Sequence, residues 1–108
     1  MAPGDITTAR RVASMDDLTQ AGDYTGPHDV KYEDGVKQYV WFLLPTHKGE
    51  DKFDRADEHS GLHGISQPPW VFRECADGSL EIRESIGCGP KPYYWHGYLD
   101  EGNLWREV

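Results

Sequence analysis

A β-hairpin signature in the carboxyl-terminal half constrains this fold more than any other feature of the chain. Asp77-Gly78 lies in the middle of an apolar-rich stretch, residues 69–86. An Asp-Gly pair between alternating apolar side chains is the strongest short-range signal for a β-hairpin. Two more such stretches follow at residues 93–99 and 103–108. We therefore expect antiparallel sheet throughout this part of the chain.

A second hairpin is expected earlier in the chain. Residues 33–35 have the composition of a turn. In residues 36–44, which follow, both the even-numbered and the odd-numbered positions are mostly apolar. A strand that is apolar on both faces is covered by other layers above and below, so residues 36–44 are expected to form a central strand. Pro45 ends it, because proline cannot donate to a sheet ladder.

The amino-terminal part is poor in aliphatic residues. Only four of the twenty Ile, Leu, Val and Phe residues lie among the first 35. Ser14 followed by acidic residues is typical of a helix start, which predicts a short helix over residues 14–21. We expect residues 1–29 to form an arm that carries this helix. Residues 30–108 are expected to form the β-rich core of a single domain that spans residues 1–108.

These patterns predict a small, mainly β fold, with an α+β fold as the alternative. We expect an antiparallel sheet, sandwich or roll of five to six strands with one short amino-terminal helix. The four Trp and six Tyr residues are expected to fill much of the core, since each large aromatic ring can bury about 150–250 Å². Glu84 interrupts the buried face of the second hairpin strand, so we expect it at the sheet rim or paired with a base such as Arg73 or Arg106.

The formal net charge of −8 limits the partners of this protein. Nucleic-acid backbones are bound through clustered Lys and Arg, so nucleic acid is an expected partner only through mimicry of its charge. No apolar run approaches the ~20 residues that span a bilayer, and we expect no membrane contact. The amino terminus lacks the pattern of a secretion signal, which predicts a cytoplasmic protein with Cys75 and Cys88 as free thiols.

An acidic stretch provides the first candidate site. Residues 47–61 contain one large apolar side chain, Phe53, and are expected to form a long exposed loop. Long loops in compact domains are often functional, so we expect its acids, with exposed aromatic residues nearby, to contact a partner. The expected contact residues are Glu50, Asp51, Asp54, Asp57, Glu58, Trp95 and Tyr98.

Histidines provide an alternative site. His59 and His63 are four residues apart, a spacing that places two imidazoles on one helix face for metal binding. The intervening Gly61 opposes a helix, but in a loop the pair can still ligate Zn²⁺ together with His96 or a cysteine. The alternative interpretation is therefore a metal-binding module or metal-dependent enzyme that uses His59, His63 and His96.

Aromatic residues allow a third interpretation. Exposed Trp and Tyr side chains can form a stacking platform for sugars or bases, whereas the scarcity of aliphatic residues favours a place in the core for most of these rings. The residues concerned are Trp41, Trp70, Trp95, Trp105, Tyr93, Tyr94 and Tyr98. A carbohydrate-binding module is one function expected of such a platform.

From residue 40 onward the chain resembles a family of small proteins of unknown function from tailed phages of actinobacteria. The stretches that carry the resemblance are residues 40–45, 61–65, 77–86, 95–102 and 105–106. Broader relatives carry a Cys-x-x-Cys motif and a Cys-His pair that suggest a metal. This chain lacks the motif, and Trp95 precedes His96 where a cysteine stands in those relatives. The resemblance implies a phage protein in the cytoplasm of its bacterial host.

The interpretation we adopt from the sequence is a non-catalytic, acidic, phage-encoded binding protein that engages a host or phage macromolecule. Small size, strong acidity and the lack of nucleophile motifs and phosphate-binding loops favour it over an enzyme. We expect a protein partner, for which the host is one source, and no cofactor. An open sheet edge would also allow a homodimer.

Overall fold

The computed structural model describes residues 4–45, 62–88 and 95–108, which fold as two β-sheets. The mainly β fold predicted from the sequence is confirmed. These ranges contain nine strands, more than the expected five to six. The strands are β1 (Ile6–Thr8), β2 (Arg10–Val12), β3 (Asp23–Tyr32), β4 (Gly35–Leu43), β5 (Leu62–Gln67), β6 (Val71–Glu74), β7 (Leu80–Cys88), β8 (Trp95–Asp100) and β9 (Leu104–Glu107).

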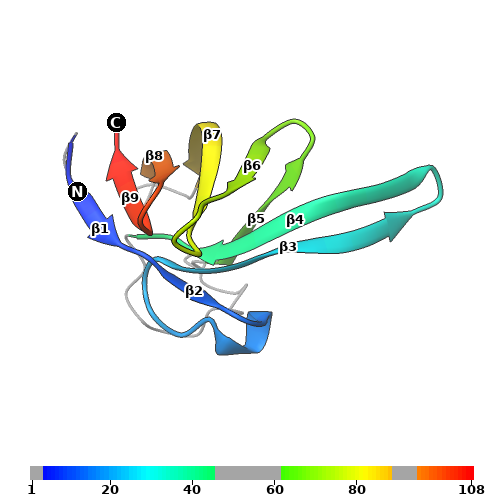
Figure 1. The fold of residues 1–108 in the computed structure, drawn as a ribbon, viewed down its shortest axis with the longest axis horizontal. Helices are drawn as coiled ribbons and strands as arrows, with labels where there is room; N and C mark the ends of the chain where they lie inside the picture. Colours follow the sequence, from blue (N-terminus) through cyan, green and yellow to red (C-terminus); the bar gives the residue numbers. More distant parts are fainter. Residues whose placement is uncertain (1–3, 46–61, 89–94) are drawn as a thin grey trace.

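The edge strands connect the two sheets (Figure 1). One sheet has the order β1-β9-β8-β7-β6 and the other the order β2-β3-β4-β5. All pairs are antiparallel except β2 with β3, which is parallel. Only Ala9 separates β1 from β2, and residues 68–70 lead from β5 into β6. Each edge strand of one sheet therefore continues into an edge strand of the other. Both β1 and β2 come from residues that the sequence predicted as an amino-terminal arm.

A single 3₁₀ turn, Met15–Asp17, replaces the helix expected over residues 14–21. The Ser14 hydroxyl makes no capping hydrogen bond to the turn. Leu18 leaves the helical conformation and is fully buried, while the carboxylate of Asp23 accepts the next two backbone amides. Burial and competing hydrogen bonds therefore end the helix after one turn. In the parts of the chain that the structure describes, no helix has the length and apolar character needed to span a bilayer.

Both hairpins predicted from the sequence are confirmed. β6 and β7 pair around a turn in which Gly78 has φ +86° and the Asp77 carboxylate accepts the amide of Ser79. β3 and β4 pair around a turn at residues 33–34. The loop end of this second hairpin projects beyond the other strands (Figure 1).

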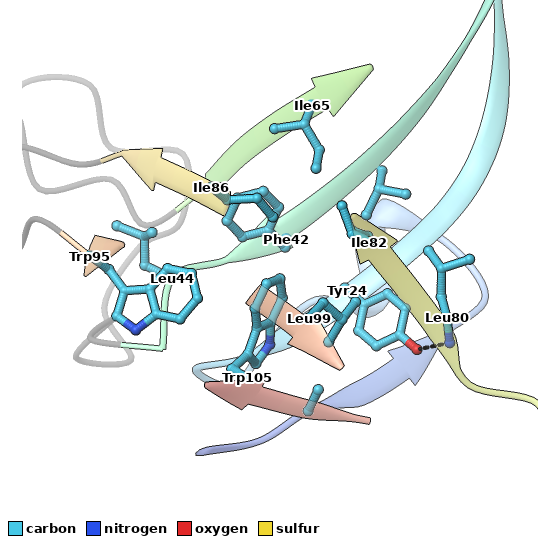
Figure 2. Packing of buried hydrophobic residues seen from close by; sticks show 12 residues of the cluster. Tyr24, Phe42, Leu44, Ile65, Leu80, Ile82, Ile86, Trp95, Leu99 and Trp105 are labelled. Atoms are coloured by element: carbon cyan, nitrogen blue, oxygen red, sulfur yellow. Dashed lines mark hydrogen bonds between the residues drawn. The ribbon is translucent and has the colours of Figure 1, made fainter. Parts of the chain in front are cut away.

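Aromatic rings form the centre of the core (Figure 2). The ring centroid of Trp105 in β9 lies 5.3 Å from that of Phe42 in β4 and 5.3 Å from that of Trp95 in β8. Tyr24 of β3 meets Trp105 edge-on, and its hydroxyl accepts the amide of Leu80 from the opposite sheet (Figure 2). Both of these Trp residues are fully buried. Large rings thus fill the space for which the sequence has few aliphatic side chains.

A bulge in β7 explains the polar residue within its apolar pattern. Between Ile82 and Ile86, four residue steps along β7 oppose two along β8, and both Ile side chains face the core. Glu84 lies in this bulge with φ +70° and an exposed side chain. Arg73 and Arg106 pair with other carboxylates, and neither forms an ion pair with Glu84. Of the two expectations for Glu84, a place at the sheet rim or an ion pair, the ion pair with these bases is therefore wrong.

Candidate functional site

The described residues include few of the contact residues predicted from the sequence. Glu50, Asp51, Asp54, Asp57 and Glu58 lie outside the described residues, as does His59. Tyr98 is half-buried on the outer side of β8, with the Arg106 guanidinium 4.8 Å from its ring centroid. Trp95 is fully buried, which corrects the expectation of an exposed contact residue. Its indole lies over Gly97, where a Cβ would be 2.7 Å from two ring carbons.

The structure does not bring the described histidines of the alternative metal site together. His63 of β5 faces the core beside Phe42, with ring centroids 6.2 Å apart. Its Nε2 is buried without a hydrogen-bond partner among the described residues, and burial lowers the pKa of His63. His96 follows the buried Trp95 in β8 and so points out of the other sheet. His63 therefore faces the core from one sheet, whereas His96 lies on the outer face of the other sheet.

One group of potential metal-ligand atoms does occur in the described ranges. The thiol of Cys75 and the carboxylates of Asp77 and Glu101 lie within 4.8 Å of one another. Both acids are exposed, and Asp77 Oδ1 accepts the amide and the hydroxyl of Ser79. Asp77 therefore stabilises the β6–β7 turn, and this group includes none of the histidines predicted as ligands.

Three aromatic residues form a partly exposed surface on the outer side of the four-stranded sheet. Val40 and Phe42 of β4 point into the core, so the alternating Tyr39 and Trp41 point outward. The rings of Tyr39 and Trp41 are nearly parallel, 12° apart, with centroids 5.4 Å apart. Tyr32 of β3 is 44% exposed and donates from its hydroxyl to that of Tyr39 across 2.6 Å. We call Tyr32, Tyr39 and Trp41 the aromatic face.

A bulge in β3 keeps that strand in register with the aromatic face. Trp41 pairs with Thr25. Tyr39 pairs with His28, so three residue steps along β3 oppose two along β4. Gly26 lies in the bulge with φ +123°, and a Cβ there would be 2.6 Å from the carbonyl oxygen of Tyr39, so the position requires glycine. The bulge leaves the His28 imidazole on the outer side, with Nε2 2.8 Å from Thr25 Oγ1.

A glycine of β5 determines where the Trp41 indole lies. Gly64 pairs with Trp41, and a Cβ on Gly64 would be 2.3 Å from Cζ3 of the indole. The ring therefore lies against the backbone of β5, which any side chain at this position would prevent. Tyr39 packs against the same ring from β4. These contacts hold the Trp41 indole in place without a ligand.

Polar groups adjoin the aromatic face. The Lys37 ammonium lies 5.6 Å from the ring centroid of Tyr32, within cation–π range. The hydrogen bond to Tyr39 is the main cause that raises the pKa of Tyr32, so this hydroxyl keeps its proton at neutral pH. The surface thus combines aromatic rings with phenol hydroxyls, an imidazole and an ammonium group.

The sequence predicted the aromatic face only in part. Trp41 belongs to the stacking platform considered from the sequence, whereas Tyr32 and Tyr39 do not. The expectation that residues 36–44 are covered on both faces is wrong for Tyr39 and Trp41, which are partly exposed; Leu43, on the same side, is fully buried. The alternation of residue types along β4 is the sequence signal that distinguishes its outer face from its core face, because Tyr and Trp carry polar groups that tolerate contact with water.

The aromatic face can bind by stacking and by hydrogen bonding. It lies on the outer side of the four-stranded sheet, where two strands supply its residues and a glycine of a third strand supports them. Comparison with known proteins identifies no relative of this chain: no family model, no curated protein and no solved structure matches it.

Proposed function

We propose that this chain is a non-catalytic binding protein that engages a macromolecule through its aromatic face. The nearly parallel, partly exposed rings of Tyr39 and Trp41 carry the proposal. Tyr and Trp are among the residue types that supply most of the binding energy at macromolecular interfaces. A partly exposed surface on the outer side of a sheet suits an extended partner, whereas small ligands bind in concave pockets.

Contacts within the protein hold the side chains of the aromatic face in place, which supports this role. The Trp41 indole lies against Gly64, and Tyr39 is held by Trp41 and by the hydroxyl of Tyr32. Side chains that are ordered before binding lose little conformational entropy in the complex. The aromatic face therefore needs little rearrangement to bind.

The acidic residues remain part of the proposal. In it, the chain is a phage protein in the host cytoplasm, as its resemblance suggests, and the acids at residues 50–58 form a second contact region. The net charge of −8 disfavours an exposed polyanion as partner. Replacement of the five acids by amides is expected to weaken capture of the partner, and unchanged capture removes these acids from the proposal.

A capture experiment tests the use of the aromatic face. Immobilised protein is exposed to a lysate of actinobacterial cells, and the retained protein, nucleic acid and polysaccharide are measured separately. The test variant combines Tyr39→Ala with Trp41→Ala. Val71→Ala is the control, because Val71 is an exposed apolar residue of β6 in the other sheet.

Loss of an aromatic hot spot typically costs about 2 kcal/mol or more, which is about 30-fold in affinity. We expect that loss for the double variant and none for the control. Tyr32→Ala is a second variant, because Tyr32 lies on the projecting hairpin outside the core cluster. Equal retention by the wild type and both variants, or no macromolecule retained by the wild type, overturns the proposal.

A further inference from the structure

We infer that the aromatic face binds the neutral sugar rings of a polysaccharide. This inference rests on the proposed function and names the class of its ligand. A pyranose ring has an apolar surface of C–H groups and a rim of hydroxyl groups. Its binding site therefore needs aromatic rings with hydrogen-bonding groups beside them.

The outer side of the four-stranded sheet provides both kinds of group. Tyr39 and Trp41 supply nearly parallel rings 5.4 Å apart. The hydroxyl of Tyr39 lies 2.6 Å from that of Tyr32, and a phenol hydroxyl both donates and accepts. The ammonium of Lys37 lies over the Tyr32 ring and adds a donor. Apolar and polar contacts for a sugar therefore occur together.

Polar neighbours favour a sugar over a protein partner. The centre of a protein–protein interface is dry and depleted of charge. Across the sheet, Tyr39 instead lies between His28 on β3 and Ser66 on β5. An imidazole and a hydroxyl beside an aromatic ring match a hydroxylated polymer better than an apolar protein surface.

Charge favours a neutral sugar over a nucleic acid. Bases also stack on aromatic side chains, but each nucleotide brings a phosphate that is bound through Lys and Arg. The protein carries a formal charge of −8, and Lys37 supplies the cation beside Tyr32. A neutral polysaccharide makes the same stacking contacts without this repulsion.

Purified oligosaccharides of glucose, N-acetylglucosamine, mannose and galactose, in α and β linkages, are the probes for the test. Binding is detected on a printed array and titrated by isothermal titration calorimetry. We expect the wild type and Val71→Ala, which changes an exposed residue of β6 in the other sheet, to bind the same probes with equal affinity. By analogy with stacking on bases, Trp41→Ala or Tyr39→Ala should each weaken binding about 5- to 150-fold.

Gly64→Ala is the sharpest variant. It keeps every aromatic residue but displaces the Trp41 indole, so we expect a loss of affinity comparable to that of Trp41→Ala. Tyr32→Ala, on the projecting hairpin, keeps the test decisive if a change at Trp41 or Gly64 prevents folding. The inference is overturned if none of the probes binds, or if the folded aromatic-face variants bind them as tightly as the wild type.

The lysate experiment separates this inference from the proposed function. Captured polysaccharide survives protease and nuclease and releases hexoses or hexosamines on acid hydrolysis. Material that depends on the aromatic face but is destroyed by protease or nuclease, and releases no hexose or hexosamine on acid hydrolysis, overturns the sugar inference and leaves the proposed function standing. Capture that does not depend on the aromatic face overturns the proposed function itself.

Discussion

Trp105 donates from its indole nitrogen to the carbonyl oxygen of Gly22, a buried hydrogen bond of 2.8 Å. Trp105 belongs to β9 of the five-stranded sheet, and Gly22 directly precedes β3 of the other sheet. The amide of Gly22 in turn donates to the carbonyl oxygen of Leu43 in β4. These two bonds fix the central ring of the core relative to the two strands that carry the aromatic face.

Trp105→Phe is expected to lower the free energy of unfolding by about 2–4 kcal/mol, because it leaves a cavity and removes the donor of a buried carbonyl oxygen. Urea unfolding followed by circular dichroism measures the change. Trp41→Phe is the control and should cost about 1 kcal/mol or less, since Trp41 is partly exposed and lies outside the core cluster. Equal losses would contradict the central place of Trp105.

Gly97→Ala is expected to destabilise the protein more than Gly64→Ala. A Cβ at residue 97 would lie 2.1 Å from the carbonyl oxygen of Arg106 in the paired strand β9, which cannot move without distorting the sheet. We expect a loss of about 3 kcal/mol. At residue 64 the three atoms nearest to the Cβ all belong to the Trp41 side chain, which can rotate, so a loss of about 1 kcal/mol is expected. Thermal unfolding of both variants gives the order, and the reverse order would refute the close approach at Gly97.

The hairpins could be predicted because their turns are specified locally. Asp77-Gly78 needs no information from the rest of the chain to form a turn. The helix expected at Ser14 failed for the opposite reason. Its start signal is local, but burial of Leu18 depends on the tertiary fold. Asp23, which accepts the amides of Thr19 and Gln20, is itself held by Arg10 of β2. Local signals therefore hold where no tertiary contact competes with them.

The aromatic face, too, could be predicted from local sequence signals only in part. Alternation along β4 separates Tyr39 and Trp41 from the core residues, so one strand of the site was within reach of the sequence. The positions of Tyr32 and Gly64 beside them depend on strand pairing and on the β3 bulge. Register of this kind is set by tertiary packing and turn geometry rather than by a local pattern.

Asp23→Asn is expected to lower the free energy of unfolding by about 1–2 kcal/mol at pH 7, because it breaks the ion pair of the buried carboxylate with the half-exposed Arg10. Burial raises the pKa of Asp23, but the hydrogen bonds from Arg10, Thr19 and Gln20 outweigh it and lower the pKa below 3.8. The stabilisation is therefore complete above pH 3.8 and is lost as the pH falls through the folded value. Unfolding of both proteins across this range should show their difference vanish in acid, and a constant difference would contradict the ion pair.

Glu84→Gly is expected to raise the free energy of unfolding by about 0.5–1 kcal/mol. A residue with a Cβ pays about 1–2 kcal/mol for a left-handed conformation, and Glu84 has φ +70°. Part of this gain is offset by the greater flexibility of glycine in the unfolded chain. Glu84→Ala keeps the Cβ and the strain, so it should give no gain. Equal stability of the two variants in urea unfolding would show that the bulge stores no strain at this residue.

His63→Gln is expected to flatten the pH dependence of stability on the acid side of neutrality. Burial lowers the pKa of His63 below its ordinary 6.5, so the unfolded chain takes up a proton at a higher pH than the folded protein. The stability that the neutral imidazole provides is complete above pH 6.5 and falls as the pH drops from 6.5 towards the folded value. Urea midpoints measured across this window should fall less steeply for His63→Gln than for the wild type. An equal slope for the wild type and His63→Gln would mean that burial of His63 is not the cause of this pH dependence.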